Sequence, residues 1–459
     1  MNLHLLPDDF VSRMRALLGA EAGEFFAALE HGSPSRSLHV NVRKIDAAGF
    51  AALFESTYPQ LWLEAIPWSR GGFYIRGEAV DDFKPSRCAL HHAGLYYMQE
   101  AAAQAAVEAL DVMPGQRVLD LCAAPGGKTS QIADRLGGDG ILVTNDIIPS
   151  RANILLSNIE RMGVCNAVVT CMPPEPLCGR FDGYFDRVLV DSPCSGESMF
   201  RREPEAIGEW STDAVELCAA RSLKILDSAA QALRPGGVMV YSTCTWAPEE
   251  DEGVVSGFLR VHPEFELLPL ELPGSAPGLT ENCARFYPHK CDGEGQFIAK
   301  LMKTETVDGG QGRYAYKFAP YRDVPMRELA AQFNIDAAYL AGYVPQRVGD
   351  AVLLLPQEMP DTQGVRVLRA GVRFAELSQR YSKPCHAASH ALDIAAYRNV
   401  IDLPLMSDEL TSYLHGEQLT APEGVRDGWC AVSAAGHVLG FGKCAGGAVK
   451  NHYPAGLRV

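Results

Sequence analysis

The sequence predicts an α/β protein with a doubly wound parallel sheet at its centre, between a small α+β N-terminal domain and a β-rich C-terminal module. Short apolar runs alternate with segments of helical periodicity between residues 117 and 244, as in proteins with parallel sheets. The polar stretch TETVDGGQGR then separates this region from a remainder with several Gly-Gly and Pro turns. We expect four domains, at 1–83, 84–303, 304–384 and 385–459.

The N-terminal region combines helical and strand patterns. Residues near 8–30 and 46–56 have helical periodicity, and SLHVNVRKI at 37–45 alternates like a strand. The stretch AGLYYMQEAAAQAAVEAL at 93–110 predicts a single amphipathic helix. Its apolar positions repeat at spacings of three or four, at Leu95, Met98, Ala102, Ala105 and Ala109.

The central region indicates a Rossmann-like order of strands and helices. Strands of this length that alternate with helices form parallel sheets covered on both faces. The expected strands are RVLDLC, GILVTND, NAVVTC, DRVLVD, GGVMVYSTC and a late EGQFIAKLMK. The expected helices are GGKTSQIADRL, SRANILLSNIERMG and CAARSLKILDSAAQAL.

The composition is that of a globular protein of the reducing cytosol. Apolar residues make up 47% of the 459 positions, and no run of 18 or more apolar residues predicts a membrane span. Near the N-terminus, Asp8 and Asp9 precede any apolar core, and this is not the pattern of a secretory signal. The 13 cysteines include no C-x-x-C pair, which argues against a zinc site and a disulfide framework. We expect a cytoplasmic monomer without a metal.

The charge is acidic overall but unevenly distributed. A net charge of −15 argues against nonspecific coating of nucleic acid, because phosphate binding requires a basic surface. Two stretches, 84–92 and 428–459, nevertheless contain no acid. Each is either a local binding patch or a solvated basic face. Their basic residues are Lys84, Arg87, His91 and His92 in the first stretch, and Lys443, Lys450 and Arg458 in the second.

The first strand–turn–helix of the central region, VLDLCAAPGGKTSQIA, predicts a cofactor loop. Its small residues at 122–127 let the backbone approach a ligand, and the following helix presents free N–H groups. A Walker phosphate loop would need glycine where Cys122 stands, and the pattern G-x-G-x-x-G fails because only Gly126 and Gly127 are available.

Asp146 is the candidate ligand for a ribose. It ends the next strand about 20 residues after Gly127, where an acid accepts both ribose hydroxyls. The alternative role for Asp146 is a helix cap or a solvated charge. A short glycine loop with a ribose acid and no phosphate cradle predicts S-adenosylmethionine as the cofactor.

Two later strands each end in a turn that carries a cysteine. Cys194 follows the fourth strand in DSPC and Cys244 follows the fifth in STC, at the edge where open α/β sheets bind ligands. Adjacent strands lie about 5 Å apart, so we expect both thiols to face one pocket. The alternative is that both cysteines are inert packing residues.

Methylation of carbon 5 of a pyrimidine requires a thiol. A thiolate adds to carbon 6, which makes carbon 5 nucleophilic enough to attack a methyl sulfonium. A base must then remove the carbon 5 proton so that the thiol can leave. A carboxylic acid at the N3 edge of the base offsets the charge formed during attack, and Asp191 is placed for that role.

Several motifs resemble those of the Sun-type RNA cytosine-5 methyltransferases: CAAPGGKT, DSPCSG, YSTCT and RFYPHKCDGEGQF. The ending LGFGKCAGGAVKNHYPAGLR resembles the PUA-like RNA-binding module of bacterial members. The resemblance runs through nearly the whole chain. It implies RNA as the partner and small-subunit ribosomal RNA as the expected substrate, with transfer RNA left open.

The resemblance also implies roles for individual residues. Cys244 corresponds to the nucleophile, Cys194 to the cysteine that assists product release, and Asp191 to the residue that contacts the target base. An acid that the family often carries after the third strand is missing, because Pro173 stands near its expected place. Glu175 is off register, so no adenine contact is assigned. The implied cofactor residues are Cys122, Ala123, Ala124, Pro125, Gly126, Gly127, Lys128, Asp146 and Asp191.

Three other functional classes fit the sequence less well. A DNA cytosine-5 methyltransferase would attack with the Pro-Cys thiol and carry a long target-recognition insert, and none is evident. An amino-group methyltransferase would show Asn/Asp-Pro-Pro-aromatic where this chain has Asp-Ser-Pro-Cys. A non-enzymatic RNA-binding protein would leave the cofactor loop and both thiols without a role.

Overall fold

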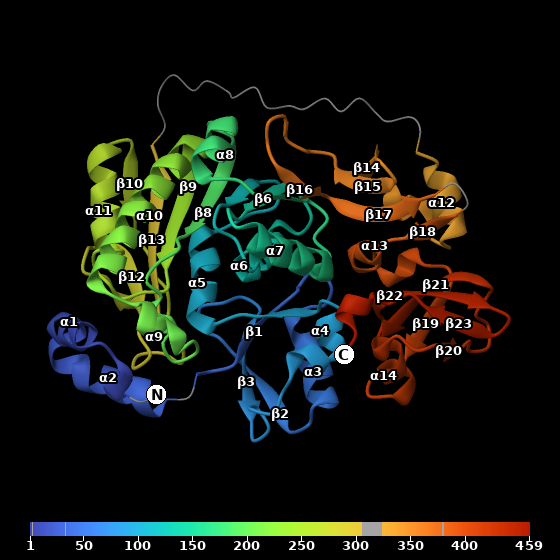
Figure 1. The fold of residues 1–459 in the computed structure, drawn as a ribbon, viewed down its shortest axis with the longest axis horizontal. Helices are drawn as coiled ribbons and strands as arrows, with labels where there is room; N and C mark the ends of the chain where they lie inside the picture. The colour runs from blue at the N-terminus through green and yellow to red at the C-terminus, as the bar shows by residue number, and fades with distance from the viewer. Residues whose placement is uncertain (2, 33, 305–323, 379–380) are drawn as a thin grey trace.

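A large central sheet occupies the middle of the computed structural model, with β1–β3 below it and the C-terminal sheets to its right in Figure 1. The structure describes residues 1–459 apart from 2, 33, 305–323 and 379–380. Among the described residues, no helix is both long enough and apolar enough to cross a membrane.

The central sheet has ten strands in the order β11-β12-β13-β9-β8-β5-β6-β7-β16, and β10 also pairs with β13. The five strands from β9 to β7 are parallel, and their neighbours on either side are antiparallel to them. The predicted doubly wound sheet is therefore confirmed. The strands are β5 (Arg117–Asp120), β6 (Ile141–Asn145), β7 (Ala167–Thr170), β8 (Phe185–Asp191), β9 (Leu233–Thr243), β10 (Phe265–Leu268), β11 (Ala276–Pro277), β12 (Cys283–Phe286), β13 (Gln296–Lys303) and β16 (Val367–Ala370).

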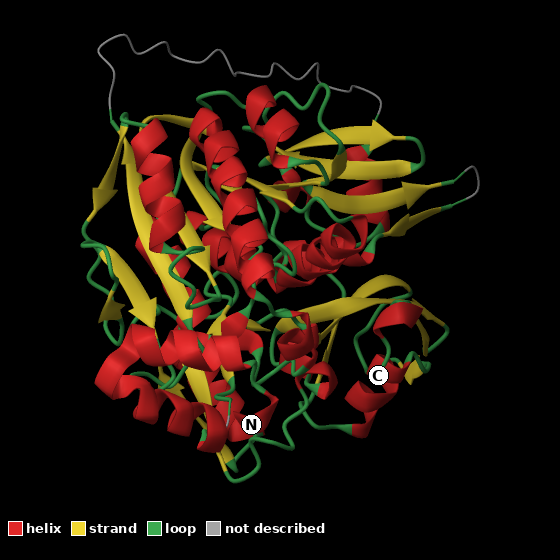
Figure 2. Ribbon diagram, turned by 60° about the vertical axis from the view of Figure 1, so that its left-hand side comes forward, coloured by secondary structure: helices red, strands yellow, loops and turns green. Residues whose placement is uncertain are grey.

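Helices cover both faces of this sheet (Figure 2). Successive residues of a strand point to opposite faces, so Val118 packs with α5–α7 and Leu119 packs with α8, α10 and α11. Burial on both faces explains why these strands are almost continuously apolar. The helices are α5 (Ala101–Leu110), α6 (Gly127–Leu136), α7 (Pro149–Met162), α8 (Pro174–Arg180), α9 (Glu205–Glu209), α10 (Thr212–Ala232) and α11 (Glu252–Val261).

The N-terminal domain contains an antiparallel sheet in the order β2-β3-β1-β4. The helices α1 and α2 do not pack on this sheet. Instead, Phe10 and Phe25 join a separate core with Trp210 and Trp246 of the central domain. The elements are α1 (Asp8–Leu18), α2 (Ala22–His31), β1 (Ser37–Val40), α3 (Ala47–Thr57), β2 (Leu61–Ala65), β3 (Gly72–Gly77), α4 (Ala89–His92) and β4 (Tyr96–Met98).

The prediction of one helix over 93–110 is wrong for its first half. Residues 96–98 form β4, which pairs with β1, and α5 begins only at Ala101. Gly94 turns the chain with a φ of 68°, and the Glu100 side chain caps α5 by accepting from the Ala103 N–H at 2.8 Å. The buried Tyr96 ring packs on Phe50, so tertiary contacts outweigh the helical periodicity here.

Part of the predicted intermediate domain belongs to the central sheet. The strand β16 pairs antiparallel with β7 at the sheet edge. Apart from Thr304, the predicted polar break at 304–313 lies outside the described residues. The remaining strands of this region form the sheet β14-β15-β17-β18. Its elements are α12 (Met326–Gln332), β14 (Tyr343–Val348), β15 (Ala351–Pro356), β17 (Val372–Leu377) and β18 (Ser382–Pro384).

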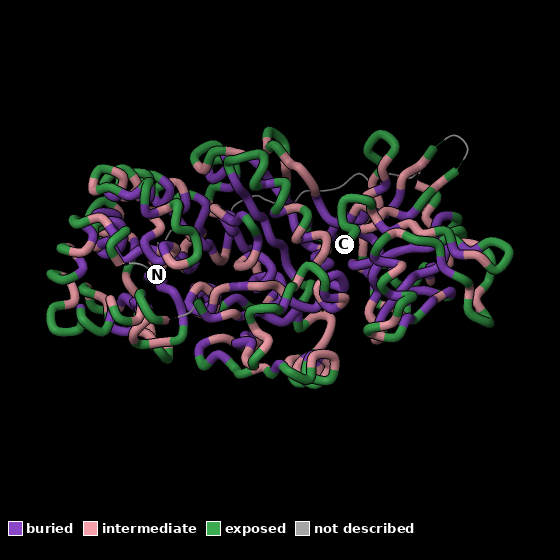
Figure 3. Tube along the Cα trace, turned by 60° about the horizontal axis from the view of Figure 1, so that its bottom comes forward, coloured by how far each residue is buried: buried purple, intermediate pink, exposed green. Residues whose placement is uncertain are grey.

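The C-terminal module shares its apolar cores with other parts of the chain. Tyr413 and Val432 pack in one core with Leu38 of β1, and Trp429 packs in another with Phe374 of β17. In Figure 3 residues coloured as buried therefore lie both at the centre of the molecule and in this module. Its sheet has the order β19-β21-β22-β23-β20. The elements are α13 (His386–Ala391), β19 (Val400–Leu403), α14 (Asp408–His415), β20 (Leu419–Thr420), β21 (Gly428–Ala434), β22 (His437–Ala445) and β23 (Ala448–Asn451).

Candidate active site

The two predicted thiols lie next to each other at the carboxyl edge of the central sheet. The strands β8 and β9 are parallel neighbours, with Asp191 in register with Ser242. The turns that follow them bring the Cys194 and Cys244 sulfurs to within 3.3 Å. Both cysteines are partly exposed. The two thiols are therefore neighbours, and the expectation that they face one pocket stays a prediction.

Backbone contacts fix the two cysteine turns against one another. The Ser192 N–H donates to the Ser242 carbonyl at 2.9 Å, which extends the pairing of β8 and β9 beyond their ends. Beyond the cysteines, the Ser198 N–H and hydroxyl both donate to the Cys244 carbonyl, at 3.1 and 2.9 Å. These hydrogen bonds hold the two cysteine turns in a fixed position relative to each other.

Cys194 is held in its protonated form. A hydrogen bond with Cys244, burial and the nearby Glu250 charge together raise the pKa of the Cys194 thiol well above its usual value. In the 3.3 Å hydrogen bond between the two thiols, either sulfur can be the donor.

Asp191 is fixed by three polar side chains. One carboxylate oxygen accepts from the Lys128 ammonium at 2.8 Å, and the other accepts from the Ser242 hydroxyl at 2.7 Å and the Gln296 amide at 3.2 Å. Burial lowers the pKa of Lys128, but the charge and hydrogen bond of Asp191 together with other nearby negative charges outweigh burial, and the net pKa is raised. This edge therefore carries a charged lysine–aspartate pair beside the thiols.

The predicted cofactor loop has the close backbone packing that its small residues require. Gly126 has a φ of 113°, and a Cβ built at this position would meet Leu155 of α7 at 3.1 Å. A Cβ at Gly127 would meet the Tyr97 ring at 3.1 Å. The helix α6 begins at Gly127, so its first backbone N–H groups have no partner within the helix and are available to a ligand at the loop.

Three carboxylates gather around this loop and fit a cationic nucleoside cofactor. The buried Asp120 accepts from the Thr129 hydroxyl at 2.6 Å, and its other oxygen has no hydrogen-bond partner among the described residues. Burial raises the pKa of Asp120 to about 7, against the Thr129 hydrogen bond, and the charges of Asp191 and Asp146 act in the same direction as burial. An unpaired buried acceptor beside two further acids suits a ligand with ribose hydroxyls and positive charge.

The structure gives Asp146 a capping contact as well as a place near the loop. It is 4% exposed, and one of its carboxylate oxygens accepts from the Ile148 N–H at 2.9 Å at the start of α7. Its other oxygen lies 3.4 Å from the Arg151 guanidinium. The ribose role and the capping role that the sequence left open are compatible, because a carboxylate has two oxygens with several acceptor positions.

The other cofactor residues that the resemblance named lie where the loop crosses the sheet edge. The Ala123 N–H donates to the Asn145 carbonyl at 2.8 Å. Arg151 and Asn158 of α7 donate to the Ala124 and Pro125 carbonyls, both at 2.9 Å. Burial, followed by the charges of nearby acids, raises the pKa of the Cys122 thiol, so it stays protonated and inert. Pro173 precedes α8, and no carboxylate takes its place, since Glu175 is exposed.

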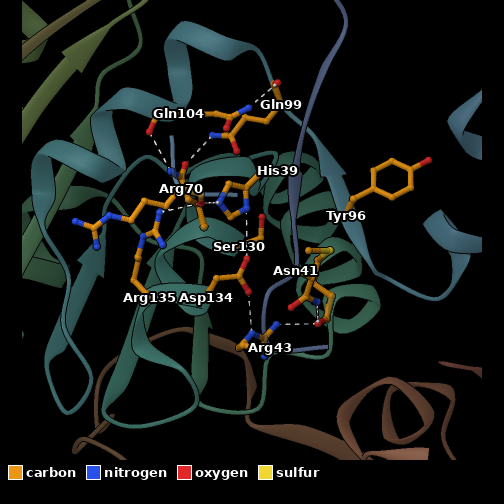
Figure 4. Close-up of polar contacts among 12 residues, drawn as sticks. His39, Asn41, Arg43, Arg70, Tyr96, Gln99, Gln104, Ser130, Asp134 and Arg135 are labelled. Carbon is orange, nitrogen blue, oxygen red and sulfur yellow. Dashed lines mark hydrogen bonds and ion pairs between the residues drawn. The ribbon is translucent and has the colours of Figure 1, made fainter. Parts of the chain in front are cut away.

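The N-terminal domain supports the cofactor helix from the other end. Figure 4 shows His39 and Arg43 directed at Asp134 in the last turns of α6. The Arg43 Nε donates to Asp134 at 3.0 Å, and the His39 ring nitrogen lies 3.4 Å from its other oxygen. Arg43 also donates to the Met162 carbonyl at the end of α7, at 2.8 Å. Breaking such a buried charge cluster by removing one member is strongly destabilising.

Sequence reasoning missed three residues of this site. Ser242 and Gln296 bond Asp191, and the buried Glu250 lies behind the cysteine turns. The signal for Glu250 was the acid run PEEDE directly after YSTCTWA, because an acid within a few residues of a turn cysteine can reach it. The signal for Gln296 was its place near the end of the motif RFYPHKCDGEGQF, which carries the resemblance without a role for this residue. In the described part of the chain, no group of three or more potential ligands is arranged to hold a metal.

Comparison with known proteins identifies the family. The family described as 16S rRNA methyltransferase RsmB/F matches residues 107–302. The N-terminal domain of 16S rRNA methyltransferase RsmF matches 6–101, and the methyltransferase RsmF PUA domain matches 400–459. A methyltransferase homolog from Pyrococcus horikoshii has a similar fold, with a TM-score of 0.58 and 31% identity over 66% of this chain and 97% of that chain.

Full-length relatives are similar over almost the whole chain. Ribosomal RNA small subunit methyltransferase F of Klebsiella pneumoniae (strain 342) is 34% identical over 472 residues, which cover 99% of this chain and 97% of that protein. The protein of the same name from Erwinia tasmaniensis is 34% identical over 98% of this chain and 96% of its own length. The resemblance that the sequence motifs indicated is thereby confirmed, and the chain belongs to the RsmF family of 16S ribosomal RNA methyltransferases.

Proposed function

We propose that the protein methylates carbon 5 of cytidines in 16S ribosomal RNA, with Cys244 as the attacking thiol. The observation that carries this proposal is the pair of sulfurs 3.3 Å apart beside the Lys128–Asp191 ion pair. Thiol attack is a requirement of methylation at carbon 5, whereas methylation of an amino group or a ribose hydroxyl needs no thiol. S-adenosylmethionine, the cofactor of this methyltransferase, supplies the methyl group when it is bound at the loop 122–128.

The protonation of the two thiols supports Cys244 as the nucleophile. Cys194 holds its proton because of its hydrogen bond with Cys244, its burial and the negative charge nearby. We assign attack on carbon 6 to Cys244, the cysteine that corresponds to the nucleophile by the family resemblance. Once Cys244 is a thioether, it can no longer carry a negative charge, so one of the causes of the raised Cys194 pKa is removed. Cys194 then becomes able to take part in removing the carbon 5 proton, which releases the Cys244 sulfur.

Asp191 is placed to bind the pyrimidine edge. Three donors hold its carboxylate, and it remains partly exposed at the same edge as the thiols. A carboxyl group at N3 stabilises charge that develops on the ring during thiolate attack, and a fixed group does so without reorganisation. Lys128 connects this carboxylate to the cofactor loop, so one ion pair orients both substrates.

The C-terminal module supports an RNA substrate. Lys443 and Lys450 lie directly opposite each other on β22 and β23, and both are exposed. Like charges in this position destabilise a sheet, so their presence favours a surface that binds phosphates. The other acid-free stretch is a different case. Burial lowers the pKa values of His91 and His92, and His92 is hydrogen-bonded with the Tyr453 hydroxyl at 2.8 Å, so His92 connects this stretch to the C-terminal module.

The test is to identify the methylated nucleoside. Small ribosomal subunits from a strain that lacks the gene are incubated with the protein and methyl-labelled S-adenosylmethionine, and the RNA is digested to nucleosides for mass spectrometry. We expect label in 5-methylcytidine from 16S ribosomal RNA. Label in N4-methylcytidine, 5-methyluridine or a ribose would overturn the proposal, and label in transfer RNA alone would overturn its choice of substrate.

A further inference from the structure

We infer that Glu250 is a positioning residue. Its buried carboxylate links the two cysteine turns by hydrogen bonds and places a negative charge near Cys194, so that Cys194 keeps its proton while Cys244 attacks. This inference rests on the proposed function, because it assigns different states to the two thiols. Glu250 is 0% exposed and lies in the turn between β9 and α11, six residues from Cys244 along the chain. It touches neither the cofactor loop nor the Asp191 cluster.

The hydrogen bonds of Glu250 reach both cysteine turns. One carboxylate oxygen accepts from the Ser195 N–H at 2.9 Å, and the other accepts from the Ser195 hydroxyl. Since that hydroxyl gives its proton to Glu250, it accepts from the Thr245 hydroxyl, at 2.9 Å. Ser195 follows Cys194 and Thr245 follows Cys244, so this chain of hydrogen bonds links the residues next to the two sulfurs.

The position of the Glu250 backbone is fixed independently of its carboxylate. The buried Tyr241 hydroxyl donates to the Glu250 carbonyl at 2.5 Å. A second carboxylate braces the turns from the other side, where Glu197 accepts from the Trp246 N–H at 2.9 Å and from the Trp210 indole at 3.0 Å. Glu197 follows Cys194 by three residues, so its bond to Trp246 also links the two turns, whereas Glu250 links them at the residues directly after the cysteines.

The charge of Glu250 acts on Cys194. It is one of the causes that hold the pKa of the Cys194 thiol high, after the hydrogen bond with Cys244, burial and the Cys244 charge. Burial raises the pKa of Glu250 itself to about 7, against the Ser195 hydrogen bonds. The titratable and charged groups that face Glu250 are Cys194, Cys218, Glu197, Glu249, Asp251 and Tyr241.

The consequence is an ordered use of the two sulfurs. A thiolate on Cys244 and a carboxylate on Glu250 both oppose ionisation of Cys194, so Cys194 does not compete for carbon 6. The same hydrogen bonds keep the sulfurs in contact, so Cys194 remains in reach after the Cys244–carbon 6 bond has formed. Loss of the carboxylate charge and loss of the hydrogen bonds should therefore have separable effects.

The effect of the Glu250 charge on Cys194 is tested by alkylation of the full-length protein without RNA. Iodoacetamide is added over a range of pH, and the modified Cys194 and Cys244 peptides are quantified by mass spectrometry. We expect Glu250→Gln, which keeps an acceptor for the Ser195 N–H, to move the midpoint for Cys194 down by about one pH unit, the size of a neighbouring-charge effect. The matched control is Glu249→Gln, an exposed acid paired with Arg13, which should leave the midpoint unchanged.

The hydrogen bonds are tested by a second pair of variants. Glu250→Ala removes both acceptors and should lower kcat about tenfold or more with the KM for S-adenosylmethionine unchanged, whereas Glu250→Gln should restore most of kcat. Equal alkylation curves for Glu250→Gln and Glu249→Gln, or wild-type kcat in Glu250→Ala, would overturn the inference. Alkylation requires no methyl transfer, so a methylated atom other than carbon 5 would defeat the proposed function and leave the alkylation result standing.

Discussion

The two edges of the central sheet each carry a partly buried lysine, and the pKa values of the two lysines are shifted in opposite directions. At the carboxyl edge, Lys128 bonds Asp191 at 2.8 Å, and that acid raises its pKa in spite of burial. Toward the opposite edge, Lys44 donates to the Ala93 carbonyl at 2.7 Å, and no carboxylate pairs with it among the described residues. Burial, with the charges of Arg43 and Arg161, lowers the pKa of Lys44 to about 7.

A cavity lies on the side of Lys44. Lys44 lines a cavity of about 680 Å³ that Gly140 and Asn166, at the amino ends of β6 and β7, also line. At the carboxyl edge, by contrast, the side chains of Lys128, Asp191 and Ser242 are bonded to one another. We place the proposed chemistry at the carboxyl edge because the thiol pair, the lysine–aspartate pair and the cluster of acids lie at the carboxyl ends of strands.

The sharpest test of the carboxyl edge separates the two thiols. Cys244→Ala should be inactive and form no covalent RNA adduct, because the bond to carbon 6 cannot form. Cys194→Ala should still attack and transfer the methyl group, then stall as a slower protein–RNA band in denaturing electrophoresis. The double variant should show no band, because attack precedes release.

The thiol test has a cysteine control and two contradicting outcomes. Cys385→Ala, at the start of α13, should behave like the wild type. A band in Cys244→Ala, with none in Cys194→Ala, would make Cys194 the nucleophile, as in the DNA-type mechanism. No band in either single variant would return both thiols to a packing role.

Variants of the two carboxylates at the same edge should lose activity through different kinetic parameters. Asp191→Asn should lower kcat by about 10²-fold or more, as when a donor that stabilises transition-state charge is lost. Asp146→Ala should mainly raise the KM for S-adenosylmethionine. Since Asp146 also accepts from the Ile148 N–H, Asp146→Asn serves as the control that keeps an acceptor for the cap. Identical kinetic profiles for Asp191→Asn and Asp146→Ala would show that one role is misassigned.

The smallest effect is expected at the opposite edge, on stability. The folded pKa of Lys44 is about 7, below the ordinary lysine value of 10.5, so between these pH values the unfolded chain binds more protons and stability rises with pH. Lys44→Met keeps an apolar stem without the charge. It should raise the free energy of unfolding by about 1 kcal/mol or more at pH 6.5, and by less at pH 9.5.

Activity distinguishes the two lysines in the same experiment. Lys44→Met should retain methylation, whereas Lys128→Met should lose most of it because Asp191 is left without its ion-pair partner. Denaturant unfolding at the two pH values, with methylation assays beside it, measures both effects. A gain in stability that does not depend on pH would show that Lys44 is not the titrating group.

Local patterns in the sequence were sufficient to predict the central sheet and the edge at which the two cysteines meet. Apolar runs that lead into CAAPGGKT, DSPC and STC identify three strand ends, and carboxyl ends of parallel strands share one edge. For that reason the proximity of Cys194 and Cys244 followed from connectivity. The loop 122–128 and Asp191 were placed at this edge by the same rule, whereas their roles come from the family resemblance and stay predictions.

Elements that depend on distant partners were not predictable in this way. Residues 96–98 have helical periodicity, yet they pair with β1 because the Tyr96 ring is buried against Phe50. The strand β16 joins the central sheet from a region that reads as a separate domain. In both cases a non-local contact outweighs local propensity, and a single sequence carries no sign of that contact.

The sequence by itself determined the alternation of strands and helices, the position of the small-residue loop and the presence of a cysteine after each of two strands, because these depend on residue types at short spacing. Tertiary structure raised the pKa of the Cys194 thiol, through the Cys244 hydrogen bond, burial and the buried Glu250. It also decided that Lys128 is paired and Lys44 is not. A pKa depends on burial and on charges within a few ångströms, and those distances exist only once the chain is folded.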